Sequence, residues 1–148
     1  VAAPVGSLRP QATTTLVGLA GAPVAPQAAV RSDQVGTILF DHGSTRLLKQ
    51  DKRLLTQIAE LHRQRSGIVR VVGHASSRTR EANPVRHQMI NFEISLKRAN
   101  TVAAELRRLG VPAEAIVVEA KSNSEPKFHE WMPSGEAGNR RADIFIDY

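Results

Sequence analysis

The stretch NFEISLKRANTVAAELRRLGVP, residues 91–112, holds the most regular hydrophobic pattern in the chain. Its apolar side chains recur every three or four residues: Ala99, Val102, Ala103, Leu106 and Leu109. This spacing predicts an amphipathic helix that buries one stripe against a core. Asn91 is expected to be the N-cap, with Glu93 in the first turn where the helix dipole favours an anion. Gly110 and Pro112 end the predicted helix.

Shorter apolar runs surround this helix on both sides. The residues at 35–41, 68–72, 115–120 and 142–148 are predicted to be strands, and 47–65 a second helix. The order β-α-β-α-β-β predicts an α/β fold, a two-layer sandwich in which helices cover a mixed sheet. Because helices connect successive strands, we expect parallel neighbours joined by right-handed crossovers.

Two further segments carry local predictions. The polar residues from His74 to about Ile90 are interpreted as a loop, since Pro84 interrupts them and no apolar period runs through them. In the last strand, clean alternation predicts one inward face: Ala142, Ile144, Ile146 and Tyr148.

The chain divides by composition near residue 31. Of its 148 residues, the first 30 include four prolines, eight alanines and a single charged residue, Arg9. They contain too little bulky apolar surface to offset the entropy of folding. We interpret 1–31 as a Pro/Ala-rich extended tether or docking tail, with a targeting segment as the alternative, and 32–148 as one folded domain.

Several classes of chemistry are excluded or disfavoured. The chain has no cysteine, and its five histidines never occur at a helical metal-binding spacing, so no metal site is expected. No Gly-rich phosphate loop is present, and no cofactor is expected. Asp41, His74 and Ser76 supply the residue types of a nucleophilic triad, but Ser76 is not in a nucleophile elbow. None of these patterns supports a catalytic site.

The charge favours an anionic partner. The net charge is +6 at pH 7, which suits nucleic acid, lipid headgroups or acidic polymers. Nucleic acid is not the expected partner, because no predicted strand carries aromatic residues on which bases could stack.

A more specific signal comes from motifs in a fixed order: Gly73-His74, Asn91-x-x-Ile94-Ser95-x-x-Arg98-Ala99 and Asn139-Arg140-Arg141. Together with Ile38-x-Phe40, Leu109-Gly110-Val111 and Glu125-Pro126, they resemble the OmpA-like peptidoglycan-binding domain over about residues 35–148. The resemblance implies a non-catalytic periplasmic module that binds the diaminopimelate-bearing stem peptide of peptidoglycan. The segment 1–31 then resembles the arm that links such domains to the outer membrane.

The resemblance also implies a set of ligand-binding residues. In the family an arginine takes a carboxylate of diaminopimelate, and Arg98 occupies that position. An aspartate takes the ammonium, but Ser76 stands in its place here. Ser76 and His74 are expected to shape the ammonium end, with Asn91 and Arg140 on the rim. Asp41 and Glu81 are the alternative sources of the missing charge.

Other interpretations stay open. Arg98 could pack its stem on the helix while its head stays in water, and Asn139-Arg140-Arg141 could brace the loop. The competing function is envelope protein–protein interaction or assembly, in which the fold is kept but the peptidoglycan site is altered or lost. In that case the basic loop at 78–87 or the tail would dock onto an envelope protein.

Overall fold

The computed structural model describes residues 31–76, 83–122 and 137–148. Its elements are β1 (Ser32–Leu39), α1 (Lys49–Arg65), β2 (Ile68–His74), α2 (Pro84–Arg108), the short 3-10 helix η3 (Ala113–Ala115), β3 (Ile116–Ser122) and β4 (Arg141–Asp147). The predicted order and α/β class are confirmed. The predicted tether lies outside the described residues except for Arg31, whose backbone exchanges two hydrogen bonds with Tyr148.

The four strands form one mixed sheet in the order β1-β4-β2-β3. β2 and β3 are parallel, as expected for strands joined by a helical crossover, whereas β4 is antiparallel to both β1 and β2. The expectation of parallel neighbours is therefore wrong for β1 and β2. These two strands do run in the same direction, but β4 returns from the end of the chain and occupies the place between them.

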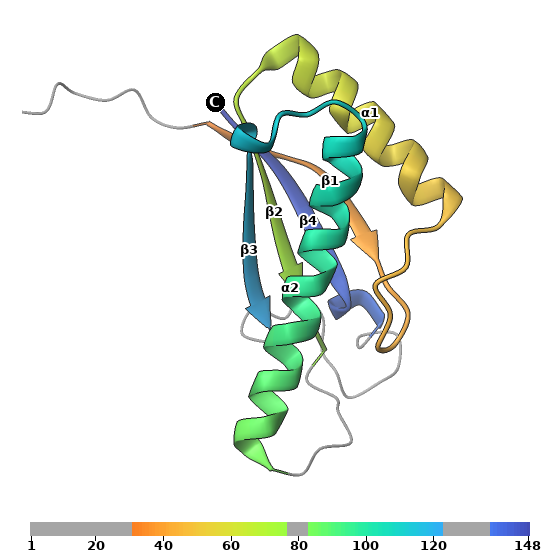
Figure 1. Cartoon of the computed structure of the whole chain (residues 1–148), viewed down its shortest axis with the longest axis vertical. Coiled ribbons are helices and arrows are strands. Elements are labelled where there is room, and N and C mark those ends of the chain that lie inside the picture. Colours follow the sequence, from red (N-terminus) through yellow and green to blue (C-terminus); the bar gives the residue numbers. More distant parts are fainter. Residues whose placement is uncertain (1–30, 77–82, 123–136) are drawn as a thin grey trace, which may run out of the picture. The chain divides into compact units, whose positions relative to one another are not determined.

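Helices α1 and α2 cover one face of the sheet (Figure 1), and the core lies between these layers. The buried side chains come from alternate strand positions and from one stripe of each helix: Ile38, Val69, Val71, Ile144, Ile146, Leu55, Ile58, Val102 and Leu106. The predicted stripe of α2 is confirmed, with Leu109 only partly buried at its end. Within the described residues, no helix is both long and apolar enough to span a bilayer.

Helix α2 begins earlier than the sequence pattern indicated. Asn83 is its N-cap, and the side-chain oxygen accepts hydrogen bonds from Val85 N at 3.0 Å and Arg86 N at 3.2 Å. Pro84 occupies the first turn, where its fixed φ and missing N–H cost nothing. The interpretation of 84–90 as a loop and of Asn91 as the N-cap is therefore wrong. Asn91 lies inside the helix and is buried.

Smaller boundaries also differ from the predictions: β1 begins and ends earlier than 35–41, and β2 and β3 extend two residues beyond their predicted ends. Helix α1 begins at Lys49 rather than at residue 47, and the Asp51 carboxylate accepts a hydrogen bond from Leu48 N at 2.9 Å. Tyr148 follows the end of β4 and is exposed, so it does not continue the inward face. Its ring instead contacts the guanidinium groups of Arg31 and Arg65.

Candidate functional site

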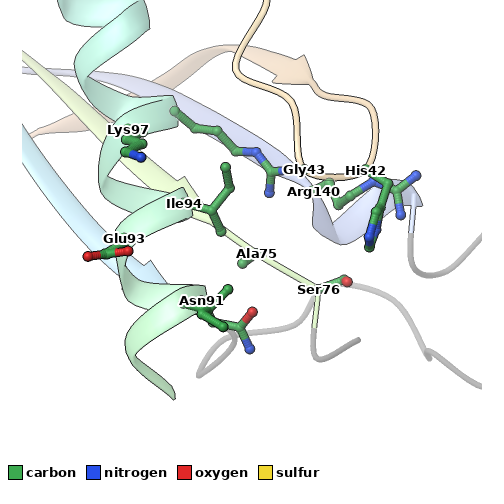
Figure 2. Close-up of a pocket in the computed structure, with 11 residues that line it drawn as sticks. His42, Gly43, Ala75, Ser76, Asn91, Glu93, Ile94, Lys97 and Arg140 are labelled. Carbon is green, nitrogen blue, oxygen red and sulfur yellow. The ribbon is translucent and has the colours of Figure 1, made fainter. Parts of the chain in front are cut away.

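A pocket of about 360 Å³ opens where the end of β2, the loop after β1 and the middle of α2 meet (Figure 2). Its lining combines basic, amide and apolar groups: His42, Gly43, Ala75, Ser76, Ile90, Asn91, Glu93, Ile94, Lys97, Arg98 and Arg140. Four of the five residues expected to bind ligand thus share one pocket, namely Ser76, Asn91, Arg98 and Arg140. His74 is not among the lining residues.

Arg98 is the largest of the fully buried side chains, with a relative exposure of 1%. Its guanidinium donates hydrogen bonds to the backbone oxygens of Ser44 at 3.1 Å, His74 at 3.1 Å and Asp41 at 3.3 Å. The interpretation that its head stays in water is therefore wrong. The side chain ties the loop after β1 to the end of β2. Because a guanidinium carries five N–H groups, these three bonds leave two for another acceptor.

The charge of Arg98 is not balanced by an acidic group among the described residues. No carboxylate among the described residues forms an ion pair with it, and all three of its acceptors are neutral carbonyls. Burial, and to a lesser extent the charge of Arg140, lowers the pKa of Arg98 to about 10. A bound anion would relieve both effects. The site is therefore suited to a negatively charged group.

Arg140 reaches the same pocket from the residue before β4. It is partly buried, and its Nε donates a hydrogen bond to Phe40 O at 3.1 Å. This bond fixes the guanidinium beside the loop that also receives Arg98. Arg140 thus braces the loop through Phe40 and also lines the pocket.

Acidic groups are scarce among the residues that the structure describes at this site. Among the described residues that line the pocket, Glu93 is the only carboxylate. Figure 2 shows its side chain on the far side of α2 from Ser76. Of the alternative acids, Asp41 contributes its backbone oxygen to Arg98 but does not line the pocket, and Glu81 lies outside the described residues.

Asn91 owes its position to the long first half of α2. Its amide Nδ2 donates to His87 Nε2 at 3.0 Å, one helical turn away. Because helix formation from Pro84 onward places His87 on the same side as Asn91, the early start of α2 orients the amide.

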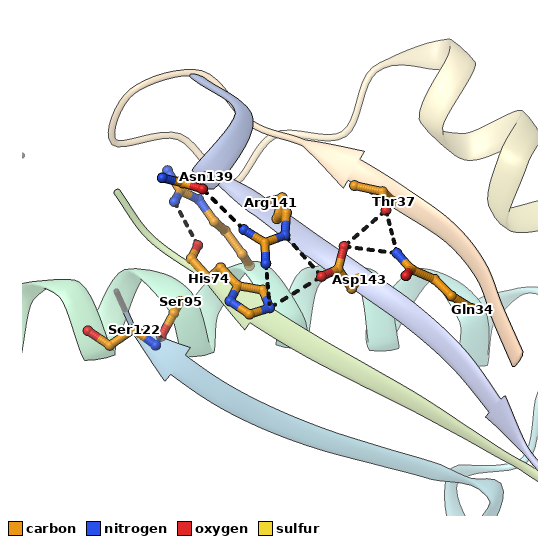
Figure 3. A network of polar contacts seen from close by, with 9 residues as sticks. Gln34, Thr37, His74, Ser95, Ser122, Asn139, Arg141 and Asp143 are labelled. Carbon is orange, nitrogen blue, oxygen red and sulfur yellow. Dashed lines mark hydrogen bonds and ion pairs between the residues drawn. The ribbon is translucent and has the colours of Figure 1, made fainter. Parts of the chain in front are cut away.

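His74 lies on the opposite face of the sheet from α2, in a polar cluster (Figure 3). Its Nε2 is 3.3 Å from Asp143 Oδ2, which also accepts from Arg141 Nε at 2.9 Å. Thr37 Oγ1 donates to the other oxygen of Asp143 at 2.9 Å. Burial acts to raise the pKa of Asp143, but the hydrogen bonds from His74, Arg141 and Thr37 outweigh it and lower the pKa to about 2. His74 Nδ1 is buried and has no hydrogen-bond partner among the described residues.

His74 therefore contributes to the pocket through its backbone rather than its ring. Its carbonyl accepts from Arg98 Nη1, while its side chain is held in the Asp143 cluster. The ring faces Asp143 and not Asp41, so the residue types of a nucleophilic triad are not assembled.

Sequence reasoning missed several lining residues, above all Lys97, His42 and Gly43. Lys97 directly precedes Arg98 and lies outside the apolar stripe of the helix. In the sequence it therefore has the pattern of an ordinary exposed helix residue. His42 and Gly43 follow the end of the first predicted strand. Their position at the same sheet edge as Ser76 was the signal that could have found them.

Comparisons with known proteins identify the fold. The OmpA family model matches residues 39–140. The cell wall anchor of the T6SS from Pseudomonas aeruginosa is 31% identical with a TM-score of 0.62, covering 74% of this chain and 78% of that chain. The peptidoglycan-associated lipoprotein from Burkholderia pseudomallei is 23% identical with a TM-score of 0.60, and the match covers 76% of this chain and 89% of that chain. The periplasmic domain of Helicobacter pylori MotB is 17% identical with a TM-score of 0.60, and the match covers 79% of this chain and 74% of that chain.

The last two structures are similar in fold alone, given their low identities. The search of curated proteins gives no significant match. The family model, however, spans well over half of the sequence and includes the whole of β2 and α2, which carry the pocket. This chain therefore belongs to the OmpA family.

Proposed function

We propose that the domain is a non-catalytic module of the cell envelope that binds the diaminopimelate-type stem peptide of peptidoglycan. The family supports this proposal, as do two similar structures, one described as a cell wall anchor and the other as a peptidoglycan-associated lipoprotein. The module then acts in the periplasm, where peptidoglycan lies.

The observation that carries the proposal is the state of Arg98. A buried guanidinium without an acidic partner is costly unless a ligand supplies the counter-charge. Its two remaining N–H groups and the neighbouring Arg140 and Lys97 suit a carboxylate, which a planar fork can bind through two hydrogen bonds. Stem peptides present carboxylates of this kind.

The test is co-sedimentation with purified sacculi at about 0.15 M salt, where exposed charges more than about 8 Å apart are screened. We expect Arg98→Gln to weaken binding about tenfold or more, because a charge-assisted pair is lost. Arg107→Gln is the matched control, since Arg107 is exposed on the same helix outside the pocket and its loss removes the same charge.

Two results would contradict the proposal. Wild-type protein that stays in the supernatant at low salt does not bind the wall. Equal losses of sacculus binding for Arg98→Gln and Arg107→Gln would show that binding depends on net charge and not on the pocket. Since Arg98 also supports the fold, thermal melting is measured for each variant. Lys97→Gln is a second pocket variant that should not disturb the fold, because the Lys97 side chain is exposed.

We further propose that residues 1–31 tether the domain to the outer membrane or to an envelope protein. Deleting residues 1–30 should leave the melting temperature of the domain unchanged and release it from outer-membrane fractions freed of peptidoglycan that retain the full chain. A clear drop in melting temperature would show instead that the segment packs on its own domain.

One observation favours the second function, an envelope interaction subunit. Val85, Met89 and Phe92 on the first turns of α2 are 66%, 58% and 49% exposed, and they lie on one side of the helix. Such a stripe suits a protein partner. If Met89→Glu abolishes cross-links to envelope proteins while sacculi are not bound at all, the interaction role replaces wall binding.

A further inference from the structure

We propose that the pocket selects a carboxylate whose neighbouring nitrogen is acylated, as in a peptide bond, over a carboxylate beside a free ammonium. This inference rests on the proposed function and specifies its ligand. The free end of diaminopimelate carries a carboxylate and an ammonium in an uncross-linked stem. In a cross-linked stem the carboxylate remains, but the amine has become an amide.

The charges around the pocket support this preference. Lys97, Arg98 and Arg140 are cations on its lining, whereas Glu93 is the only carboxylate among the described lining residues. Figure 2 shows Glu93 across α2 from Ser76. An ammonium beside a carboxylate held by Arg98 would lie near the guanidinium groups of Arg98 and Arg140. No carboxylate among the described lining residues faces it from the side of Ser76, which disfavours the ammonium.

The neutral lining suits an amide. Ser76 is 4% exposed and Asn91 3% exposed, so the neutral side chains that line this part of the pocket are themselves largely withdrawn from water. A neutral oxygen can accept a hydrogen bond from an amide N–H, but it cannot compensate an ammonium for the water that it loses on burial.

The apolar part of the lining supports the same conclusion. Ala75, Ile90 and Ile94 contribute hydrocarbon surface to the pocket. Such surface favours an acyl group attached to the ligand nitrogen and increases the cost of desolvating a charged amine. Charge, hydrogen bonding and apolar contact thus all favour the acylated ligand.

The experiment compares two forms of the same sacculi, one untreated and one treated with acetic anhydride, which converts free amines into amides and leaves the carboxylates. We expect the wild-type domain to bind acetylated sacculi more tightly than untreated sacculi. Ser76→Asp places an acid in the pocket and should give an affinity about tenfold higher for untreated than for acetylated sacculi. Ser76→Asn is the neutral control and should resemble wild type.

Acetylation also makes the wall more negative, which by itself strengthens attraction to a basic domain. The ratio of the affinities for acetylated and untreated sacculi is therefore also measured for Arg98→Gln, which reports attraction by net charge alone. Asn91→Asp is a second acid-adding variant in case Ser76→Asp does not fold. Wild-type affinity that is equal or lower for acetylated sacculi overturns the inference while leaving wall binding intact. It is also overturned if folded acid-adding variants gain no preference for untreated sacculi. Failure of the wild type to bind either form overturns the proposed function itself.

Discussion

A Cβ atom on Gly73 would lie 1.9 Å from the backbone oxygen of Ser95, so the backbones of β2 and α2 are too close here for any side chain between them. Ser95 Oγ accepts a hydrogen bond from Ser122 N at 3.2 Å, which ties β3 to the same point of the helix. Arg98 follows Ser95 by three residues and therefore lies over the end of β2. The close approach therefore positions Arg98 at the pocket.

Gly73→Ala should destabilise the domain by more than about 3 kcal/mol, because the added methyl group meets helix backbone that cannot move aside. Urea unfolding measures the free energy. Gly36→Ala is the comparison, since its Cβ would meet the flexible tip of Ile58 at 2.9 Å and should cost less. A Gly73→Ala variant as stable as wild type would contradict the packing described.

Arg98→Lys should cost about 2–4 kcal/mol of unfolding free energy even though the charge is kept. An ammonium cannot reach all three carbonyls that the planar fork holds, so buried oxygens lose their donors. Chemical denaturation of Arg98→Lys beside the exposed Arg107→Lys separates this effect from a general change of side chain. Equal stability of the two variants would mean that the three hydrogen bonds contribute nothing.

Stability should fall in acid because of Asp143. Its pKa is lowered from 3.8 to about 2 in the folded state, so its contribution is present above pH 4 and is lost as pH falls from 4 towards 2. The size of the shift corresponds to about 2 kcal/mol. Asp143→Asn should flatten this part of the pH profile of unfolding free energy. Thr37→Val, which removes one of the hydrogen bonds to Asp143, should make the fall in unfolding free energy between pH 4 and 2 smaller. An unchanged profile in Asp143→Asn would assign the acid sensitivity to other groups.

Asn83→Ala should destabilise the first turns of α2 by about 1 kcal/mol, because two backbone N–H groups lose their acceptor. Hydrogen exchange should quicken in residues 85–90 and leave the second half of the helix protected. Asn100→Ala is the control, since Asn100 is exposed inside the helix and alanine is the better helix former there. Fraying should also weaken sacculus binding, because His87 then no longer holds Asn91.

Local patterns in the sequence predicted the elements well because they depend on neighbours in the chain. The spacing of Val102 and Leu106 indicated α2, and β-branched runs indicated β2 and β3. The start of α2 was missed although Asn83-Pro84 is a recognisable N-terminal signal. The long polar stretch before Asn91 hid it, since residues 84–90 protrude beyond the core and carry no inward stripe.

The sequence by itself determined the element order and the motifs that resemble the family, and from that resemblance it predicted that Ser76 stands where the family has an aspartate. Only the tertiary structure decided that β4 lies between β1 and β2, and that His74 pairs with Asp143. It also decided the role of Arg98, whose hydrogen bonds reach residues as far as 57 positions away. The physical reason is that pairing of distant strands and burial of charge depend on contacts between remote segments, which local spacing does not encode.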